Sequence, residues 1–182
     1  MTTVQAALDN WFVRNATLLK TVMRVTFGIV WGIDGALKFQ PGFVESFSSI
    51  ISDQASNQPS WLSGWYSYWA STTTSNPAPF VYGTGLLELG LSLCLIAGFL
   101  RKLAYTGGFF LSLLIWSVPE GFGGPYGPGS TDIGTGIIYA LVFILLLLTN
   151  ATYGTSKFSL DRLIEKRWPA WKRISEIRSG PN

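Results

Sequence analysis

Four long apolar runs constrain the fold of this chain more than any other feature of its sequence. They extend over about residues 18–37, 80–100, 103–118 and 133–149. A helix needs roughly 20 predominantly apolar residues to cross the hydrocarbon core of a bilayer, and the runs are close to that length. Only 13% of the residues are charged, whereas soluble domains have about 25%. The pattern predicts an all-α integral membrane protein, built as a four-transmembrane-helix bundle.

The long segment between the first two runs, residues 39–79, is predicted to carry interfacial helices. Two stripes of apolar side chains recur there at helical spacing: Phe43, Phe47, Ile50 and Ile51, then Trp61, Trp65 and Trp69. Such stripes are typical of helices that lie on a membrane surface, and Trp concentrates at the headgroup level. Interfacial anchoring is therefore the favoured interpretation of the tryptophans, and lining a ligand site is the alternative.

The C-terminal segment, residues 157–182, is predicted to be a basic amphipathic tail, separate from a membrane domain at 1–156. Its apolar residues lie roughly along one helical face: Leu160, Leu163, Ile164, Trp171, Ile174 and Ile177. Lys and Arg occupy the other face. This distribution favours a tail that lies along the membrane surface.

The basic residues predict the orientation of the chain in a plasma membrane. Arg14, Lys20, Arg101, Lys102 and the basic residues of the tail fall on one side of a four-span arrangement, and Lys38 alone falls on the other. By the positive-inside rule, both termini are cytoplasmic and the loops at 39–79 and 119–132 are external. The basic excess therefore does not indicate nucleic-acid binding.

Two charged residues, Arg24 and Glu88, lie inside apolar runs. Each costs at least about 2.5–3.5 kcal/mol on insertion scales, so pairing or function must account for it. From the helical rise, the two positions differ in depth by about 10 Å, which a long arginine side chain could partly bridge. One interpretation is a structural ion pair between helices. The other is a polar site that a redox-active or protonatable ligand uses.

Four acids, Asp34, Glu88, Glu120 and Asp132, are predicted to converge in the outer half of the bundle, because each belongs to a different span. Buried carboxyls that repel one another can exchange protons with a ligand. The alternatives are local. Asp34 could pair with Lys38 one turn away, and Glu120 and Asp132 could cap helix ends.

The sequence PEGFGGPYGPGSTD, at 119–132, is too rich in Gly and Pro for regular structure and predicts an irregular loop. It could shape a pocket or form a tight cap of turns. The chain has no histidine and one cysteine, Cys94, so we expect no haem, metal or flavin on it; haem, iron–sulfur and zinc sites in particular need such ligands. In an apolar helix Cys94 is expected to act as a small hydrophobe.

The chain resembles the DoxD subunits of the wider DoxX-like family over nearly its whole length. The resemblance rests on the four-span layout, Arg24, the G-x-D-G-x-x-K sequence from Gly32 to Lys38, Glu88, and PEGFGGPYGPGSTDIGTG from Pro119 onward. DoxD is the membrane subunit of thiosulfate:quinone oxidoreductase in thermoacidophilic archaea. The resemblance implies oxidation of thiosulfate to tetrathionate, electron transfer to a membrane quinone, and a small DoxA-type partner subunit.

The chemistry implied by the resemblance suggests a role for each of the candidate residues. They are Glu120, Asp132, Glu88 and Asp34 for catalysis, Lys38 and Arg24 for substrate binding, and Trp116, Phe122 and Tyr126 for a quinone-binding cleft. The N–H groups of the glycine loop could also bind an anion. Thiosulfate is a dianion, however, and an acidic cluster would repel it unless the carboxyls are protonated or the partner subunit supplies the anion site.

The main alternative function is a non-catalytic membrane anchor in a larger respiratory complex, whose partners would be other subunits and membrane lipids. Glycine pairs, aromatic anchors and the lack of cofactor ligands fit that alternative. A small transporter or channel is less favoured, because four spans leave little room for a pathway within one copy.

Overall fold

The structure, a computed structural model, describes residues 3–124, 132–156 and 158–177. All regular structure among these residues is helical, which confirms the predicted fold class at that level. The α-helices are α1 (Thr3–Leu37), α2 (Phe43–Asn57), α3 (Ser63–Thr73), α4 (Ala78–Ala97), α5 (Arg101–Ser117), α6 (Thr135–Tyr153), α7 (Leu160–Arg167) and α8 (Lys172–Ser175). Short 3-10 turns occupy Ser60–Leu62, Gly121–Gly123 and Pro169–Trp171.

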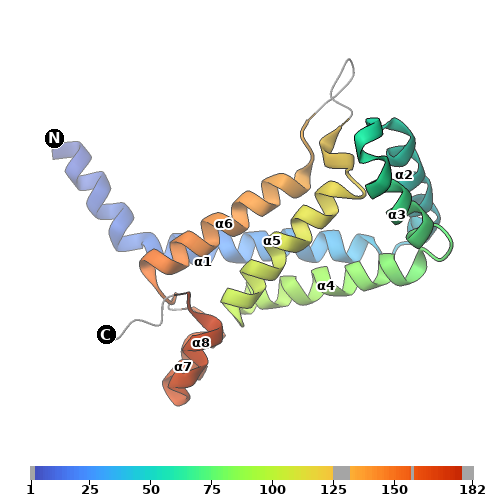
Figure 1. Cartoon of the computed structure of the whole chain (residues 1–182). Helices are drawn as coiled ribbons and strands as arrows, with labels where there is room; N and C mark the ends of the chain where they lie inside the picture. The colour runs from blue at the N-terminus through green and yellow to red at the C-terminus, as the bar shows by residue number, and fades with distance from the viewer. Residues whose placement is uncertain (1–2, 125–131, 157, 178–182) are drawn as a thin grey trace.

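The four long helices run side by side as two antiparallel pairs (Figure 1). α1 packs along α4, and α5 packs along α6. The helices α2 and α3 lie at one end of the bundle, whereas α7 and α8 lie at the opposite end. We call these two ends the α2–α3 end and the tail end.

Three helices are long and apolar enough to cross a membrane, as judged from length and composition within the described part of the chain. They are α4, α6 and the Trp11–Leu37 part of α1. These helices are consistent with a membrane protein. The predicted span at 103–118 corresponds to α5, which has 17 residues and is not one of the three.

Two glycines of α1 allow α4 to approach closely. A Cβ added at Gly28 would lie 2.8 Å from Cγ1 of Ile96, and one added at Gly32 would lie 2.8 Å from Oγ of Ser92. The Ser92 hydroxyl donates a hydrogen bond to the carbonyl oxygen of Gly28 at 2.6 Å. The G-x-x-x-G pair therefore lies in a helix contact, as this motif commonly does in membrane proteins.

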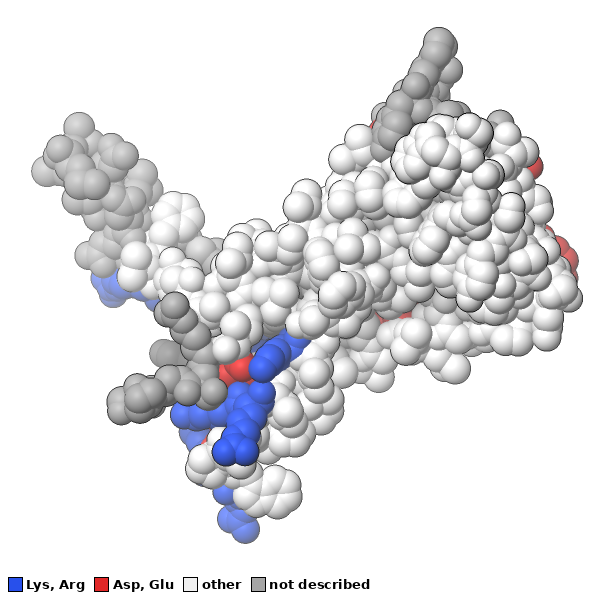
Figure 2. Space-filling model, viewed as in Figure 1, with Lys and Arg blue, Asp and Glu red and all other residues white. Residues whose placement is uncertain are grey.

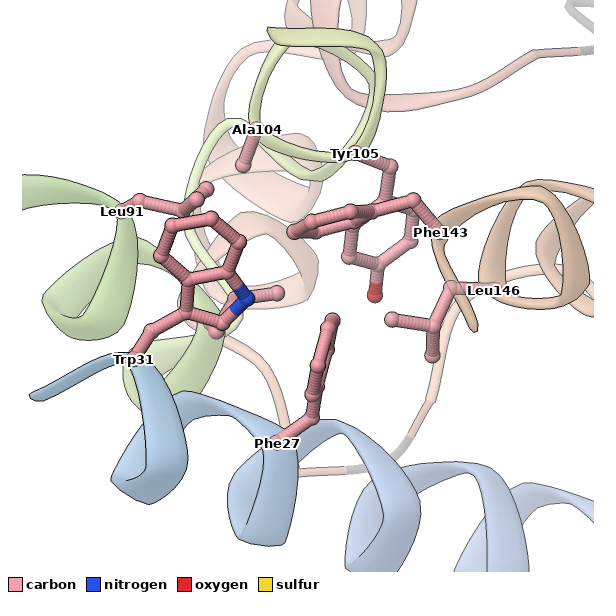
Figure 3. Packing of buried hydrophobic residues seen from close by; sticks show 8 residues of the cluster. Phe27, Trp31, Leu91, Ala104, Tyr105, Phe143 and Leu146 are labelled. Carbon is pink, nitrogen blue, oxygen red and sulfur yellow. The ribbon is translucent and has the colours of Figure 1, made fainter. Parts of the chain in front are cut away.

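An aromatic core joins all four long helices (Figure 3). Its buried members are Phe27, Trp31, Leu91, Leu95, Ala104, Tyr105, Phe143 and Leu146. The rings of Phe27 and Phe143 meet edge to face, with centroids 4.9 Å apart. Cys94 is half-buried and packs against this core. Because the side chains come from α1, α4, α5 and α6, the core fixes the two helix pairs against each other.

Replacing Gly108 by alanine is expected to destabilise the bundle by about 1–3 kcal/mol through overpacking. Gly108 in α5 lies against the Phe143 ring of α6, and an added Cβ would overlap ring atoms. Gly107→Ala is the matched control, because a Cβ there would have no neighbour within 4 Å. Thermal unfolding of both variants in one detergent tests this expectation. Equal midpoints would contradict the close α5–α6 contact.

The C-terminal segment packs on the tail end through its acids. Asp161, Glu165 and Glu176 are buried and form ion pairs with Arg101 at 2.9–3.0 Å. Leu163, which the amphipathic pattern placed on the apolar face, is 63% exposed. The face that packs on the bundle is therefore acidic, because the three carboxylates surround the guanidinium buried at the start of α5. Leu163 stays on an open face, as expected for a segment that lies along a membrane surface. Residues 158–177 of the segment therefore pack against the tail end of the bundle.

Candidate functional site

Glu88 is fully buried in α4 and pairs with Lys38. The exposed fraction of Glu88 is 1%, and its Oε2 lies 2.9 Å from Nζ of Lys38, which follows the end of α1. Lys38 thus pairs with Glu88, and the two alternatives considered from the sequence, Arg24 with Glu88 and Asp34 with Lys38, are not the pairs that form. A desolvated carboxylate needs a counter-charge, and at the α2–α3 end Lys38 is the basic side chain within reach of Glu88.

Arg24 lies near the tail end of the bundle, opposite the α2–α3 end. It is 1% exposed, and its guanidinium donates hydrogen bonds to the carbonyl oxygens of Leu95, Ile96 and Phe158. The last carbonyls of a helix lack partners within the helix, so Arg24 satisfies the C-terminal turn of α4. The structure therefore does not bring Arg24 together with Lys38, the other residue expected to bind substrate, and Arg24 lines neither of the cavities described below.

A polar cavity of about 240 Å³ lies between the long helices near the α2–α3 end. Its lining residues are Trp31, Asp34, Lys38, Glu88, Ser112, Ile115, Glu120, Thr135, Gly136 and Tyr139. The structure thus brings together three of the four acids expected to converge. The fourth, Asp132, is exposed and does not line the cavity; its Oδ1 accepts a hydrogen bond from the N–H of Gly134 at 2.6 Å. Asp132 is therefore removed from the candidate site.

Glu120 caps a helix and also borders the polar cavity. Its carboxylate accepts hydrogen bonds from the hydroxyl of Thr135 and from the N–H of Gly136, the latter at 2.8 Å. Both partners lie in the first turn of α6, where free N–H groups and the helix dipole favour a negative charge. The capping interpretation accounts for these bonds, and the same carboxylate is left facing the space inside the bundle.

An apolar cavity of about 410 Å³ adjoins the polar one. Its apolar lining includes Phe43, Phe47, Ile50, Trp69, Leu111 and Leu114. Lys38, Ile115 and Glu120 line both cavities, so the two meet at these residues. Ligand pockets usually have volumes of about 300–1,000 Å³, with mainly apolar walls and a few polar groups. The joined cavities have this character.

Trp69 lines the apolar cavity and carries an indole N–H that is unpaired within the described part of the chain. Its indole Nε1 is buried and has no hydrogen-bond partner among the described residues. Trp61, by contrast, is 79% exposed, and Nε1 of Trp65 donates to the carbonyl oxygen of Ser117 at 3.2 Å. Of the three tryptophans in the stripe, Trp69 therefore follows the ligand-lining alternative.

Tyr66 holds α3 in place beside the cavity. It is 1% exposed, and its hydroxyl donates a hydrogen bond to the carbonyl oxygen of Ser117 at 2.8 Å. Burial raises the pKa of Tyr66 to about 12, because the charged phenolate would be poorly solvated. The phenol therefore remains a protonated donor at neutral pH, and the α3–α5 contact that positions Trp69 does not titrate there.

Two of the three residues expected to form an aromatic cleft near the Gly/Pro loop contact each other. The rings of Trp116 and Phe122 meet edge to face, with centroids 5.1 Å apart, and Nε1 of Trp116 donates to the carbonyl oxygen of Ile133 at 2.7 Å. Neither residue lines the polar or the apolar cavity. Tyr126 lies outside the described residues. Trp116 and Phe122 therefore tie the two ends of the loop together, and the apolar cavity is lined by other aromatic residues.

The sequence contained a signal for the missed part of the site. The helical spacing of Phe43, Phe47 and Ile50 predicts one apolar face on α2, and that face must cover either lipid or protein. The second signal was Lys38, which lies a few residues before α2. If Lys38 pairs with one of the acids, the start of α2 must lie close to that acid. Which surface α2 covers depends on the turn between Lys38 and Phe43, which the spacing does not define.

Comparisons of the chain with protein-family models, curated proteins and solved structures found no match. The functional argument therefore rests on the two joined cavities and their lining residues.

Proposed function

We propose that this chain is the quinone-reducing membrane subunit of a thiosulfate:quinone oxidoreductase. The observation that supports it is the junction of the apolar cavity with the polar cavity. A membrane quinone combines an apolar chain with a ring that carries two carbonyl oxygens, so it needs both environments. The resemblance to DoxD subunits suggests thiosulfate as the electron donor.

The residues fit the proton requirement of the reaction. Two thiosulfate ions joined through sulfur give tetrathionate and two electrons, and a quinone takes up those electrons with two protons. In the proposed site, Glu120 borders both cavities and relays protons to the quinone ring, whereas Asp34 and Glu88 line only the polar cavity. Positioned carboxyls of this kind act as general acids.

The thiosulfate site is proposed to lie on a DoxA-type partner subunit. The polar cavity contains Asp34, Glu88 and Glu120, and Lys38 is its one basic lining residue. Because Lys38 is already paired with Glu88, a dianion there would meet a net negative surface. Lys38 is accordingly proposed to hold Glu88 in position, in place of the substrate-binding role first expected.

In the proposed membrane arrangement α5 also crosses the membrane, as the third of four spans, and α2 and α3 lie at the external interface. Figure 2 shows Lys and Arg gathered around the C-terminal segment and the adjoining tail end. Lys38 is the only Lys or Arg between residues 25 and 100. By the positive-inside rule this distribution supports a cytoplasmic tail end in the plasma membrane.

A non-catalytic anchor subunit is the second candidate function. One observation favours it: both Glu88 and Glu120 already have partners within the chain, an ion pair and a helix cap. Binding of a quinone analogue to the purified chain separates the two functions. Saturable binding at one site per chain supports the enzyme subunit, and its absence supports the anchor.

Replacing Glu120 by glutamine is expected to lower thiosulfate-dependent reduction of a quinone analogue at least tenfold, because a general acid contributes about 10²–10⁴-fold to a rate. Glutamine keeps the size and the hydrogen-bond acceptor that cap α6. Glu45→Gln is the matched control, since Glu45 is exposed on α2 and lines neither cavity. Activity is measured on the assembled complex, with assembly checked by size-exclusion chromatography. Equal turnover in both variants would remove Glu120 from the mechanism.

A further inference from the structure

The charges of the C-terminal segment are sorted between its two faces. Its three acids are buried against Arg101. Four of its basic residues are exposed: Lys166, Arg167, Lys172 and Arg173. We call these four residues the basic face. Because Asp161, Glu165 and Glu176 are the only acids between residues 158 and 177, the exposed charge over this range is entirely positive.

Contacts with the bundle fix the basic face outward. The carboxylate of Asp161 accepts hydrogen bonds from the N–H groups of Leu100 and Arg101 at 3.0 Å each, at the start of α5. It also accepts one from Nε1 of Trp171 at 2.8 Å, and the Trp171 ring stacks on Phe99. Rotation of the C-terminal segment would break all of these contacts. The basic face is therefore held on the side away from Asp161, Glu165 and Glu176.

Exposed apolar side chains lie among the basic residues. Trp168 is 67% exposed, Leu163 is 63% exposed and Phe158 is 65% exposed. Figure 1 shows α7 and α8 directed across the long helices at the tail end, extending past the side of the bundle. A segment directed across the ends of membrane-spanning helices lies along the bilayer surface, where exposed Trp and Leu enter the interface.

From this arrangement we propose that the basic face binds the phosphate headgroups of anionic lipids in the cytoplasmic leaflet. The internal ion pairs with Arg101 remove the acids that would otherwise repel such headgroups. Basic residues near an anionic bilayer surface are attracted additively, over about one Debye length. The apolar side chains favour a lipid surface over an acidic partner protein. This inference requires insertion in a membrane and does not depend on the quinone site.

The test compares lipid retention by the full-length chain in three forms: wild type, a quadruple variant and a charge-matched control. The quadruple variant carries Lys166→Gln, Arg167→Gln, Lys172→Gln and Arg173→Gln. The control carries Ser46→Glu, Ser49→Glu, Ser52→Glu and Ser56→Glu, which changes the net charge equally at exposed positions of α2. Each form is extracted from nanodiscs that contain equal amounts of phosphatidylglycerol and phosphatidylcholine, and bound lipids are counted by native mass spectrometry.

Wild type and control are expected to retain phosphatidylglycerol in preference to phosphatidylcholine, and the quadruple variant is expected to lose at least about tenfold of that preference. Adding inorganic phosphate should not displace the lipid. Raising the salt from about 0.05 to about 0.5 M should weaken the preference of the wild type by screening, which tests the inference even if the quadruple variant misfolds. Equal retention of the two lipids by wild type, or equal loss in variant and control, would overturn the proposal.

Discussion

Replacing Arg101 by methionine is expected to lower the free energy of unfolding by about 3–5 kcal/mol, the effect of removing one partner from a buried ion pair. Arg101 is 1% exposed, and it bonds Asp161, Glu165 and Glu176 at 2.9–3.0 Å. It also donates to Oδ1 of Asn150 in α6. Without the guanidinium, three carboxylates would share a buried site with no adequate counter-charge, and the C-terminal segment would detach from the bundle.

Lys102→Met provides the matched control for Arg101→Met. Nζ of Lys102 donates one exposed hydrogen bond to the carbonyl oxygen of Arg173 at 3.2 Å, so its loss should cost less than about 1 kcal/mol. Arg101→Lys is expected to fall between the two, because a compact ammonium keeps the charge but lacks the planar fork of donors whose Nε and Nη2 reach the three carboxylates. Limited proteolysis after residue 156 and thermal unfolding report the two effects. Similar midpoints for Arg101→Met and Lys102→Met would contradict the ion-pair role.

The helical class was predictable because it depends on properties that the sequence shows directly. Run length and low charge predict apolar helices, and three of them are found with the required length and composition. The boundaries were less accurate. α1 begins at Thr3, well before the apolar run at about residue 18, because a helix continues wherever backbone hydrogen bonds can form, whatever the polarity of its side chains.

The partners of the buried charges were not predictable from depth alone. The helical rise places Arg24 and Glu88 about 10 Å apart in depth, a separation that a long arginine side chain could partly bridge, so the pairing remained one interpretation. What the rise cannot show is that the end of α4 offers unpaired carbonyl oxygens to Arg24. Nor does it show that Lys38, beyond the last turn of α1, reaches Glu88. Both contacts are set by helix ends, which pattern analysis locates only to within a few residues.

Part of the candidate site followed from topology and part did not. Asp34, Glu88 and Glu120 line one cavity. In a bundle of antiparallel helices, the end of one helix and the start of the next lie at the same end of the bundle, so the three acids were expected to lie close together. Asp132 belongs to the same end but points to solvent, because its carboxylate bonds the nearby N–H of Gly134. The apolar cavity forms because α2 folds back and contacts α4. The local sequence pattern of either helix does not predict how the two are placed relative to each other.

Replacing Thr84 by tryptophan is expected to weaken binding of a quinone analogue at least tenfold, equivalent to about 1.4 kcal/mol of binding free energy. Thr84 lies in α4 and lines the apolar cavity. An indole there would fill cavity space that is proposed to hold the quinone ring or the first part of its apolar chain. The other side chains that line the cavity are left unchanged. Binding is measured with the purified chain, by equilibrium titration against the quenching of tryptophan fluorescence.

Leu87→Trp separates a filled cavity from a general effect of a large side chain on α4. Leu87 lies one turn from Thr84, is 63% exposed and lines neither cavity, so this variant should bind the analogue like the wild type. If both variants bind normally, the ligand does not occupy the apolar cavity, and the quinone site must be sought near Trp116 and the Gly/Pro loop. If Thr84→Trp alone loses binding while Glu120→Gln keeps it but loses turnover, the apolar cavity holds the quinone and the carboxylate beside it delivers the protons.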